Sequence, residues 1–219
     1  MSLAIFDLDN TLLSCDSDHA WGEFLIEQGA VDAEAYRREN DRYLRDYQAG
    51  RLDIMAYLAV ALKPLTEYSE EQLRAWHQQF MASKIEPHIL PQGEELLAWH
   101  RQRGDYLLIV TATNRFITGP IAERLGVDDL IAIEPERENG RYTGRVSGTP
   151  SYREGKVTRL NAWLESQPSL TLEDAWFYSD SINDRFLLEQ VGNPVAVDPD
   201  DELRALADDR EWRVMSLRN

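Results

Sequence analysis

Two aspartates separated by a single residue follow the first apolar segment of the chain. Asp7 and Asp9 lie in residues 7–12, Asp-Leu-Asp-Asn-Thr-Leu, directly after the apolar run Leu3–Phe6. Two carboxylates at this spacing can share a hard divalent cation, or one can act as a nucleophile and the other as a general acid. An isolated pair of this kind is also typical of a solvated acidic turn. The motif alone leaves both interpretations open.

Two further polar clusters follow later apolar runs. Residues 111–114, Thr-Ala-Thr-Asn, precede a predicted helix whose N-terminal amides could bind an anion, although Thr111 could equally be a helix cap. Residues 179–184, Ser-Asp-Ser-Ile-Asn-Asp, contain Asp180 and Asp184. These acids could complete a magnesium site, or could simply stabilise the start of a helix.

Lys156 lies at the start of a predicted helix that runs to about Leu164. A lysine in the first turn is unfavourable for the helix dipole, so we expect an anion or a carboxylate beside it. The alternative is an ordinary surface lysine. The chain has only three lysines, and this one therefore stands out.

The elements that must position these residues alternate between strands and helices. Helical segments end near Gly104 and Gly126, where glycine is favoured as a C-terminal cap, and Asn139-Gly140 indicates a tight hairpin. This order predicts an α/β fold with a doubly wound parallel sheet, in which ligands bind beyond the carboxyl ends of the strands. The predicted strands are Leu3–Phe6, Tyr106–Val110, Leu130–Ile133, Ala175–Tyr178 and Val195–Val197.

The segment 14–87 interrupts this alternation, because it has helical signals and no convincing strand. Asp32 is a candidate cap for a helix that ends near Gln48. We expect residues 14–87 to form a helical cap domain over the end of the first strand, and residues 1–13 and 88–219 to form the core domain.

Charge and composition exclude several classes of function. The 219 residues carry a formal charge of -16, which disfavours binding to nucleic acid or to anionic membranes. No apolar run approaches the roughly 20 residues that span a bilayer, and no signal peptide is recognisable. We therefore expect a cytoplasmic protein. The single Cys15 cannot form an internal disulfide, which agrees with a reducing compartment. The oligomeric state is left open.

The order of the clusters resembles the haloacid dehalogenase superfamily of phosphatases over nearly the whole chain. Residues 7–12 look like that family's Asp-x-Asp-x-Thr-Leu/Val signature, Thr111 and Lys156 match its second and third motifs, and residues 180–184 resemble its fourth. A helical insertion after the first motif is similar to the phosphoserine phosphatase-like branch. The resemblance implies a Rossmann-like core with a helical cap.

The resemblance also implies a phosphomonoesterase mechanism. Asp7 would attack phosphorus and form an aspartyl phosphate. Asp9 would protonate the leaving oxygen and then deprotonate the hydrolytic water. Thr111 and Lys156 would bind the phosphoryl oxygens and supply positive charge that this acidic chain otherwise lacks.

A magnesium ion is implied by the same resemblance. It would be bound by Asp7, by Asp9 through its backbone carbonyl, and by Asp180, with Asp184 supporting these ligands. Asn183, in the fourth motif, would contact the substrate.

Asp16 is the residue on which the predicted substrate depends. It lies nine residues after Asp7, matching an acidic position that faces the substrate amine in phosphoserine phosphatases, but it could also cap the helix that contains Trp21. The negative charge of Asp16 at the entrance of the predicted site, formed by residues 14–20, favours a phosphate ester with a cationic amine, such as phosphoserine or histidinol phosphate. Residues 16–21 and 111–116 resemble bacterial members linked with histidinol-phosphatase activity, so histidinol phosphate is the preferred prediction.

Phosphoserine would also need a cation for its carboxylate. The candidates are four arginines of the cap, Arg37, Arg38, Arg42 and Arg45. The chain departs from phosphoserine phosphatases at residues 111–113, where Thr-Ala-Thr replaces Ser-Gly-Gly, and at Ser179 and Ser181, where glycine is usual. These bulkier residues narrow a site built around close backbone approach.

Functions outside the phosphatases stay open at this point. A phosphorylated signalling receiver also combines a parallel sheet with aspartates, a threonine and a lysine, but it has no need of a helical lid. A non-catalytic cation-binding protein would explain the acids but neither Thr111 nor Lys156. A phosphomutase of the same superfamily is a further alternative.

Overall fold

The computed structural model describes residues 2–218, and this part of the chain forms a seven-stranded sheet. The strands are β1 Leu3–Phe6, β2 Tyr106–Asn114, β3 Asp129–Glu138, β4 Arg141–Ser147, β5 Trp176–Ser179, β6 Asn193–Val197 and β7 Arg213–Met215. They lie in the order β4-β3-β2-β1-β5-β6-β7. Every neighbouring pair is parallel except β3 and β4, which are antiparallel. The predicted α/β fold is therefore confirmed.

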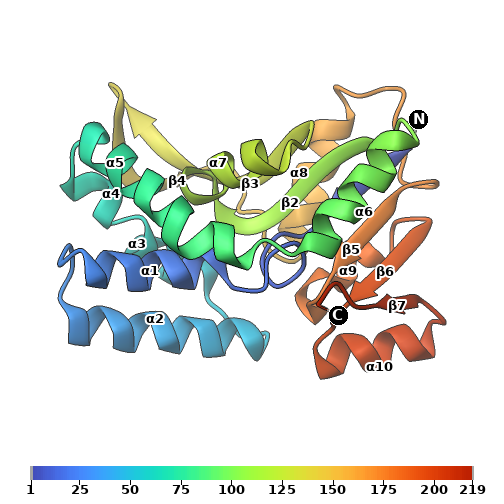
Figure 1. Cartoon of the computed structure of the whole chain (residues 1–219), viewed down its shortest axis with the longest axis horizontal. Helices are drawn as coiled ribbons and strands as arrows, with labels where there is room; N and C mark the ends of the chain where they lie inside the picture. Colours follow the sequence, from blue (N-terminus) through green and yellow to red (C-terminus); the bar gives the residue numbers. More distant parts are fainter. Residues whose placement is uncertain (1, 219) are drawn as a thin grey trace.

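Helices cover both faces of the sheet (Figure 1). Side chains of β1 alternate between two buried clusters, with Ala4 and Phe6 in one and Leu3 and Ile5 in the other. The first cluster includes residues of α6 and α7, and the second includes residues of α8, α9 and α10. The bounds of these helices are α6 Pro91–Gln102, α7 Arg115–Leu125, α8 Glu154–Leu164, α9 Arg185–Leu188 and α10 Asp201–Asp209.

Residues 14–87 contain helices and no strand, as predicted. Four of these helices begin at a residue whose side chain accepts a hydrogen bond from the first turn, and these caps are Asp16, Asp32, Asp53 and Ser69. The helices are α1 Ser17–Glu27, α2 Ala33–Gln48, α3 Ile54–Ala61, α4 Pro64–Glu67 and α5 Glu70–Phe80, followed by the π-helix Met81–Ile85 and the 3-10 helix Glu86–His88.

The helical segment 14–87 packs against helix α7, which covers one face of the sheet. The Trp21 ring of α1 meets Phe116 of α7 edge-on, with ring centroids 5.3 Å apart. His77 of α5 contacts the main-chain oxygen of Ile117 through its ring nitrogen Nε2 at 3.0 Å. We propose on this packing that residues 14–87 form the cap and residues 1–13 and 88–219 the core.

Three local features can be compared with the predictions from the sequence. The predicted hairpin is present, with Asn139 and Gly140 both at positive φ, 50° and 82°. Strand β2 continues through Asn114, so Thr111 lies inside a strand and not in the loop after it. Strand β7 was not predicted, because a three-residue edge strand is too short to show an alternating pattern.

Within residues 2–218, no helix combines the length and apolar character needed to cross a membrane.

Candidate active site

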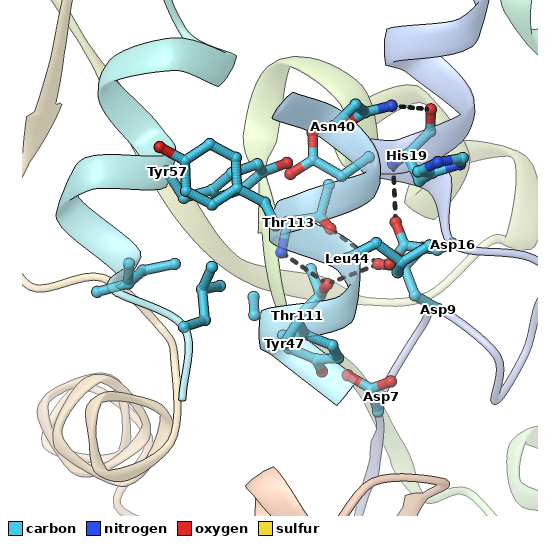
Figure 2. A pocket seen from close by; sticks show the side chains of 15 residues that line it. Asp7, Asp9, Asp16, His19, Asn40, Leu44, Tyr47, Tyr57, Thr111 and Thr113 are labelled. Atoms are coloured by element: carbon cyan, nitrogen blue, oxygen red, sulfur yellow. Dashed lines mark hydrogen bonds between the residues drawn. The ribbon is translucent and has the colours of Figure 1, made fainter. Parts of the chain in front are cut away.

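A cleft lies at the carboxyl ends of β1 and β2, where helices α1, α2 and α3 cover the sheet (Figure 2). The cleft is partly open to solvent, and both polar and apolar side chains line it. Asp7 and Asp9 from the end of β1 and Thr111 and Thr113 from β2 line its floor. Tyr47 of α2 lies beside Asp7 in Figure 2.

Lys156 connects two of the predicted acids. Its Nζ donates hydrogen bonds to Oδ1 of Asp7 and to Oδ2 of Asp184, each at 2.7 Å. Lys156 is only 1% exposed. Burial favours loss of its proton, but the two carboxylates outweigh this and raise the pKa of Lys156. The expected anionic partner of this first-turn lysine is therefore present, and it is a pair of carboxylates.

Asp7 and Asp180 meet at a shared hydroxyl. The Thr11 hydroxyl lies 3.2 Å from Oδ1 of Asp180 and 3.5 Å from Oδ2 of Asp7. Burial is the main cause that raises the pKa of Asp7 to about 7, with Asp184 and Asp9 adding to the rise and Lys156 opposing it. Burial and the charges of Asp7 and Asp184 also raise the pKa of Asp180. One lysine therefore leaves an excess of negative charge in this buried cluster.

A hard cation fits this donor set. Within residues 2–218, no three side chains of His, Cys, Asp or Glu are grouped closely enough to bind a metal ion on their own. The implied magnesium site needs only two side-chain carboxylates, Asp7 and Asp180, because main-chain oxygen and water supply the other ligands that magnesium prefers. Two carboxylates that contact one hydroxyl, in a cluster with surplus negative charge, match that requirement.

Asp9 is fixed by hydrogen bonds from two directions. Its Oδ1 accepts from the main-chain N–H of Ser17 at 2.7 Å, and its Oδ2 accepts from the Thr113 hydroxyl at 2.8 Å. The Thr111 hydroxyl lies farther from the same Oδ2, at 3.5 Å. Burial and the nearby charge of Asp16 raise the pKa of Asp9 to about 6, despite these hydrogen bonds. A carboxyl group with such a pKa can both give and take a proton near neutral pH.

The two threonines reach Asp9 because β2 is irregular at this point. The register between β2 and β3 shifts between Val110 and Asn114, which indicates a bulge across Thr111 and Thr113. The Ser151 hydroxyl donates to the main-chain oxygen of Thr111 at 2.6 Å and holds the bulge in place.

Asp16 caps a helix and also lines the cleft, and its predicted contact with a substrate amine stays a prediction. Its Oδ1 accepts from the main-chain N–H of His19 at 2.8 Å, so it caps α1. Its side chain also lines the cleft beside Asp9 (Figure 2). A capping residue with one oxygen engaged retains acceptor capacity for a ligand.

Four predicted site residues do not line the cleft, namely Lys156, Asp180, Asn183 and Asp184. Asn183 donates from Nδ2 to the main-chain oxygen of Tyr47 at 3.0 Å. The predicted contact between Asn183 and the substrate stays a prediction. Its observed contact joins the fourth motif to the end of α2.

Several residues of the cleft were not predicted from the sequence. Thr113 lies two residues after Thr111, and alternate residues of a strand lie on the same face of the sheet. This spacing could have identified Thr113 together with Thr111. On α2, Asn40, Tyr43 and Tyr47 recur at intervals of three and four, so they share one helix face, and all three line the cleft. Asp18, which belongs to the anionic entrance predicted for residues 14–20, also lines the cleft.

Comparisons with known proteins agree with this geometry. Residues 4–189 match the family described as haloacid dehalogenase-like hydrolase. A protein of Neisseria meningitidis serogroup C, named histidinol-phosphatase, is 47% identical over 221 residues, covering 99% of both chains. A structure of a protein of unknown function from Bordetella pertussis Tohama I has 45% identity and a TM-score of 0.92, covering 99% of this chain and 98% of that one.

A more distant structure shows the same fold. It is described as a phospho-aspartyl intermediate analogue of phosphoserine phosphatase, with 18% identity and a TM-score of 0.72, covering 100% of this chain and 94% of that one. The chain belongs to the haloacid dehalogenase-like hydrolases. The family and the enzyme class predicted from the sequence, a phosphoric monoester hydrolase, are confirmed.

Proposed function

We propose that the chain hydrolyses a small amine-bearing phosphate monoester through a phosphoenzyme on Asp7, with histidinol phosphate as the preferred substrate. The observation that carries this proposal is the arrangement of Asp7 and Asp9 at the floor of one cleft. One carboxylate is paired with the buried Lys156, and the other is oriented by Thr113 and Ser17. This division suits a nucleophile and a proton carrier.

The reaction has two steps. In the first, an Asp7 carboxylate oxygen attacks phosphorus, the bond from phosphorus to the ester oxygen breaks, and the leaving oxygen takes a proton from Asp9. In the second, Asp9 takes a proton from water as the water oxygen attacks the phosphorus of the aspartyl phosphate, which frees phosphate and restores Asp7. Thr111 and Lys156 would bind the phosphoryl oxygens.

Magnesium would be held by Asp7, Asp180 and the main-chain carbonyl of Asp9, with Asp184 supporting the site through Lys156. A bound magnesium ion would neutralise the phosphoryl charge. Lys156 keeps Asp7 oriented toward the cleft through its hydrogen bond to Oδ1.

The charge of the cleft supports an amine-bearing substrate. Among the described residues that line it, four are aspartates and none is lysine or arginine. A leaving group with a protonated amine would be attracted by Asp16, whereas a neutral sugar would gain nothing from this charge. The protein from Neisseria meningitidis, named histidinol-phosphatase, is consistent with such a substrate.

The same charge disfavours phosphoserine, whose carboxylate needs a cationic partner. The four cap arginines considered for this role do not line the cleft. Arg37 pairs instead with Glu23 at 3.2 Å, and Arg42 pairs with Glu39 at 2.8 Å. A receiver-like signalling role is also disfavoured, because helices α1, α2 and α3 cover the acids and line a cleft with them, and a receiver has no need of such a lid.

Phosphate release from a defined panel tests this proposal. The panel contains histidinol phosphate, phosphoserine and a neutral sugar phosphate, each with magnesium and with a chelator. We expect histidinol phosphate to have the highest kcat/KM, and chelation to abolish turnover of every member. Preference for the sugar phosphate would contradict the amine assignment, and full activity in chelator would contradict the metal assignment.

A further inference from the structure

Asp18 is an acid of the cleft that phosphoryl transfer does not use. It lies in the first turn of α1, two residues beyond Asp16, and its side chain lines the cleft. Tyr57 of α3 lines the same cleft, and its hydroxyl is among the groups that lower the pKa of Asp18 against the effect of burial. Burial and the charge of Asp18 raise the pKa of Tyr57, so this hydroxyl stays protonated and remains a donor.

Asp18 has no lysine or arginine partner among the ion pairs of residues 2–218. The nearest histidine in sequence, His19, directs Nε2 to Asp41 at 3.0 Å. The charged groups that act on Asp18 are Asp16 and Asp9, and with burial as the larger cause they raise its pKa to about 7. A cationic ligand would relieve this repulsion, because no ion pair among residues 2–218 does so.

The surroundings of Asp18 differ from those of Asp7. Figure 2 shows Tyr57 at the opposite end of the cleft from Asp7. The Tyr57 and Tyr43 rings meet there with centroids 5.1 Å apart and planes at 63°. Leu52 and Ile54 add apolar lining. A carboxylate beside aromatic and apolar walls suits a flat group that carries an N–H donor and a positive charge.

We propose that Asp18 and Tyr57 form a second recognition subsite, which binds a planar N–H-bearing cation of the leaving group, such as an imidazolium ring. This inference rests on the proposed function, because it assumes that phosphate binds at Asp7 and that the amine binds at Asp16. Three groups of one substrate would then bind in order along the cleft. The phosphate would bind at the floor, the amine beside Asp16, and the ring between Asp18 and Tyr57.

Two substrates that differ only in the ring test the subsite. Histidinol phosphate is compared with 2-aminopropyl phosphate, which keeps the amine and the phosphate but carries a methyl group in place of the imidazolylmethyl group. In the wild-type enzyme we expect the ratio of kcat/KM to favour the ring-bearing substrate. Asp18→Asn should reduce that ratio about tenfold or more, mainly through KM, because a charge-assisted hydrogen bond is lost.

Two further variants separate binding from folding. Tyr57→Phe removes one hydroxyl, keeps the ring, and should reduce the ratio about threefold, a smaller loss than that of a charged partner. Glu34→Gln changes an exposed acid in the first turn of α2 outside the cleft, and should leave the ratio as in the wild type. Thermal unfolding of each variant shows whether it is folded.

The outcomes distinguish this inference from the proposed function. If folded Asp18→Asn keeps the wild-type ratio, or if the wild type hydrolyses both substrates with no preference for the ring, the subsite is wrong and the amine assignment stands. If the wild type hydrolyses p-nitrophenyl phosphate but neither amine substrate, the proposed substrate class is wrong and the subsite is rejected with it.

Discussion

Lys156 determines the charge balance around the proposed nucleophile. Its Nζ is the cation that contacts both Asp7 and Asp184, and all three groups are almost fully buried. Loss of one partner of a buried ion pair leaves an uncompensated charge, which costs about 3–5 kcal/mol when the carboxyl group cannot take up a proton. Lys156 should therefore matter for stability as well as for catalysis.

Lys156→Met is expected to lower the free energy of unfolding by about 3 kcal/mol at neutral pH. Burial already raises the pKa of Asp7 to about 7, and loss of the lysine would raise it further. A carboxyl group with a higher pKa in the folded state binds its proton more tightly when folded. The difference in free energy of unfolding between Lys156→Met and the wild type should then be largest above the further raised pKa of Asp7. It should decrease as the pH falls toward about 5.

Urea denaturation of both proteins across this pH range measures the difference. Lys63→Met is the control, because Lys63 forms an exposed i,i+4 pair with Glu67 at 3.6 Å and should cost less than about 1 kcal/mol. Equal, pH-independent losses in the two variants would show that Lys156 does not compensate buried charge.

Thr113 orients the proposed proton carrier. Thr113→Val keeps the shape of the side chain and removes the hydroxyl that donates to Asp9. Hydrogen bonds to charged groups contribute about 1.5–3 kcal/mol, so kcat/KM should fall about 10-fold to 100-fold. Thr113→Ser should restore most of the activity. A valine variant as active as the wild type would remove Thr113 from the site.

At the scale of elements, the sequence was most informative where strands are buried and helices have caps. Leu3–Phe6 is apolar at every position because both faces of β1 are covered, and Gly126 ends α7 at a φ of 68° as the glycine indicates. The bulge in β2 was not predictable, because it depends on pairing with β3. The predicted strand ended at Val110, so Thr113 was placed in a loop and its alternation with Thr111 was not used.

The close approach of α1 and α2 provides an element-scale prediction. A Cβ added at Gly22 would lie 2.4 Å from Nδ2 of Asn40, a buried side chain of the cleft. Gly22→Ala should force the two helices or Asn40 to move and should lower the free energy of unfolding by about 1–3 kcal/mol. Chemical denaturation measures this loss.

Gly119→Ala in α7 is the matched control. An added Cβ there meets only Cγ of Arg115, at the ordinary distance of 3.9 Å. Alanine is the better helix former by about 1 kcal/mol, so this variant should be neutral or more stable. If both variants lost stability equally, the contact between α1 and α2 would not be the cause.

At the scale of the whole molecule, the chain and its cleft are strongly acidic, so we expect a bound cation to stabilise the folded state. A ligand that binds only the folded state raises stability as its concentration exceeds its dissociation constant. Magnesium should therefore raise the Tm, and a chelator should remove the increase. Asp180→Asn should respond less to magnesium than the exposed control Asp209→Asn. Equal responses in these two variants would contradict the assignment of Asp180.

The meeting of distant motifs was predicted from the alternating pattern of the sequence, whereas the order of the strands was not. Asp7, Thr111 and Asp180 lie at or just beyond three predicted strands that correspond to β1, β2 and β5, and parallel pairing of β1 with the other two brings their carboxyl ends to one edge. The cap side of the cleft was less predictable, because Tyr57 and Asp18 meet only through the packing of α1, α2 and α3. The proposed recognition of the substrate depends on this side.

A covalent phosphoryl group on Asp7 is the central element of the proposed mechanism. Asp9→Asn retains the nucleophile but lacks the base for the second step, and p-nitrophenyl phosphate has a leaving group that needs no proton. Acid quench of this variant during turnover, followed by peptide mass spectrometry, should show one added phosphoryl group on the peptide containing Asp7. Asp7→Asn, Asp9→Asn should show none. An unmodified Asp7 peptide, in a variant that still releases a stoichiometric burst of p-nitrophenol, would contradict the central claim.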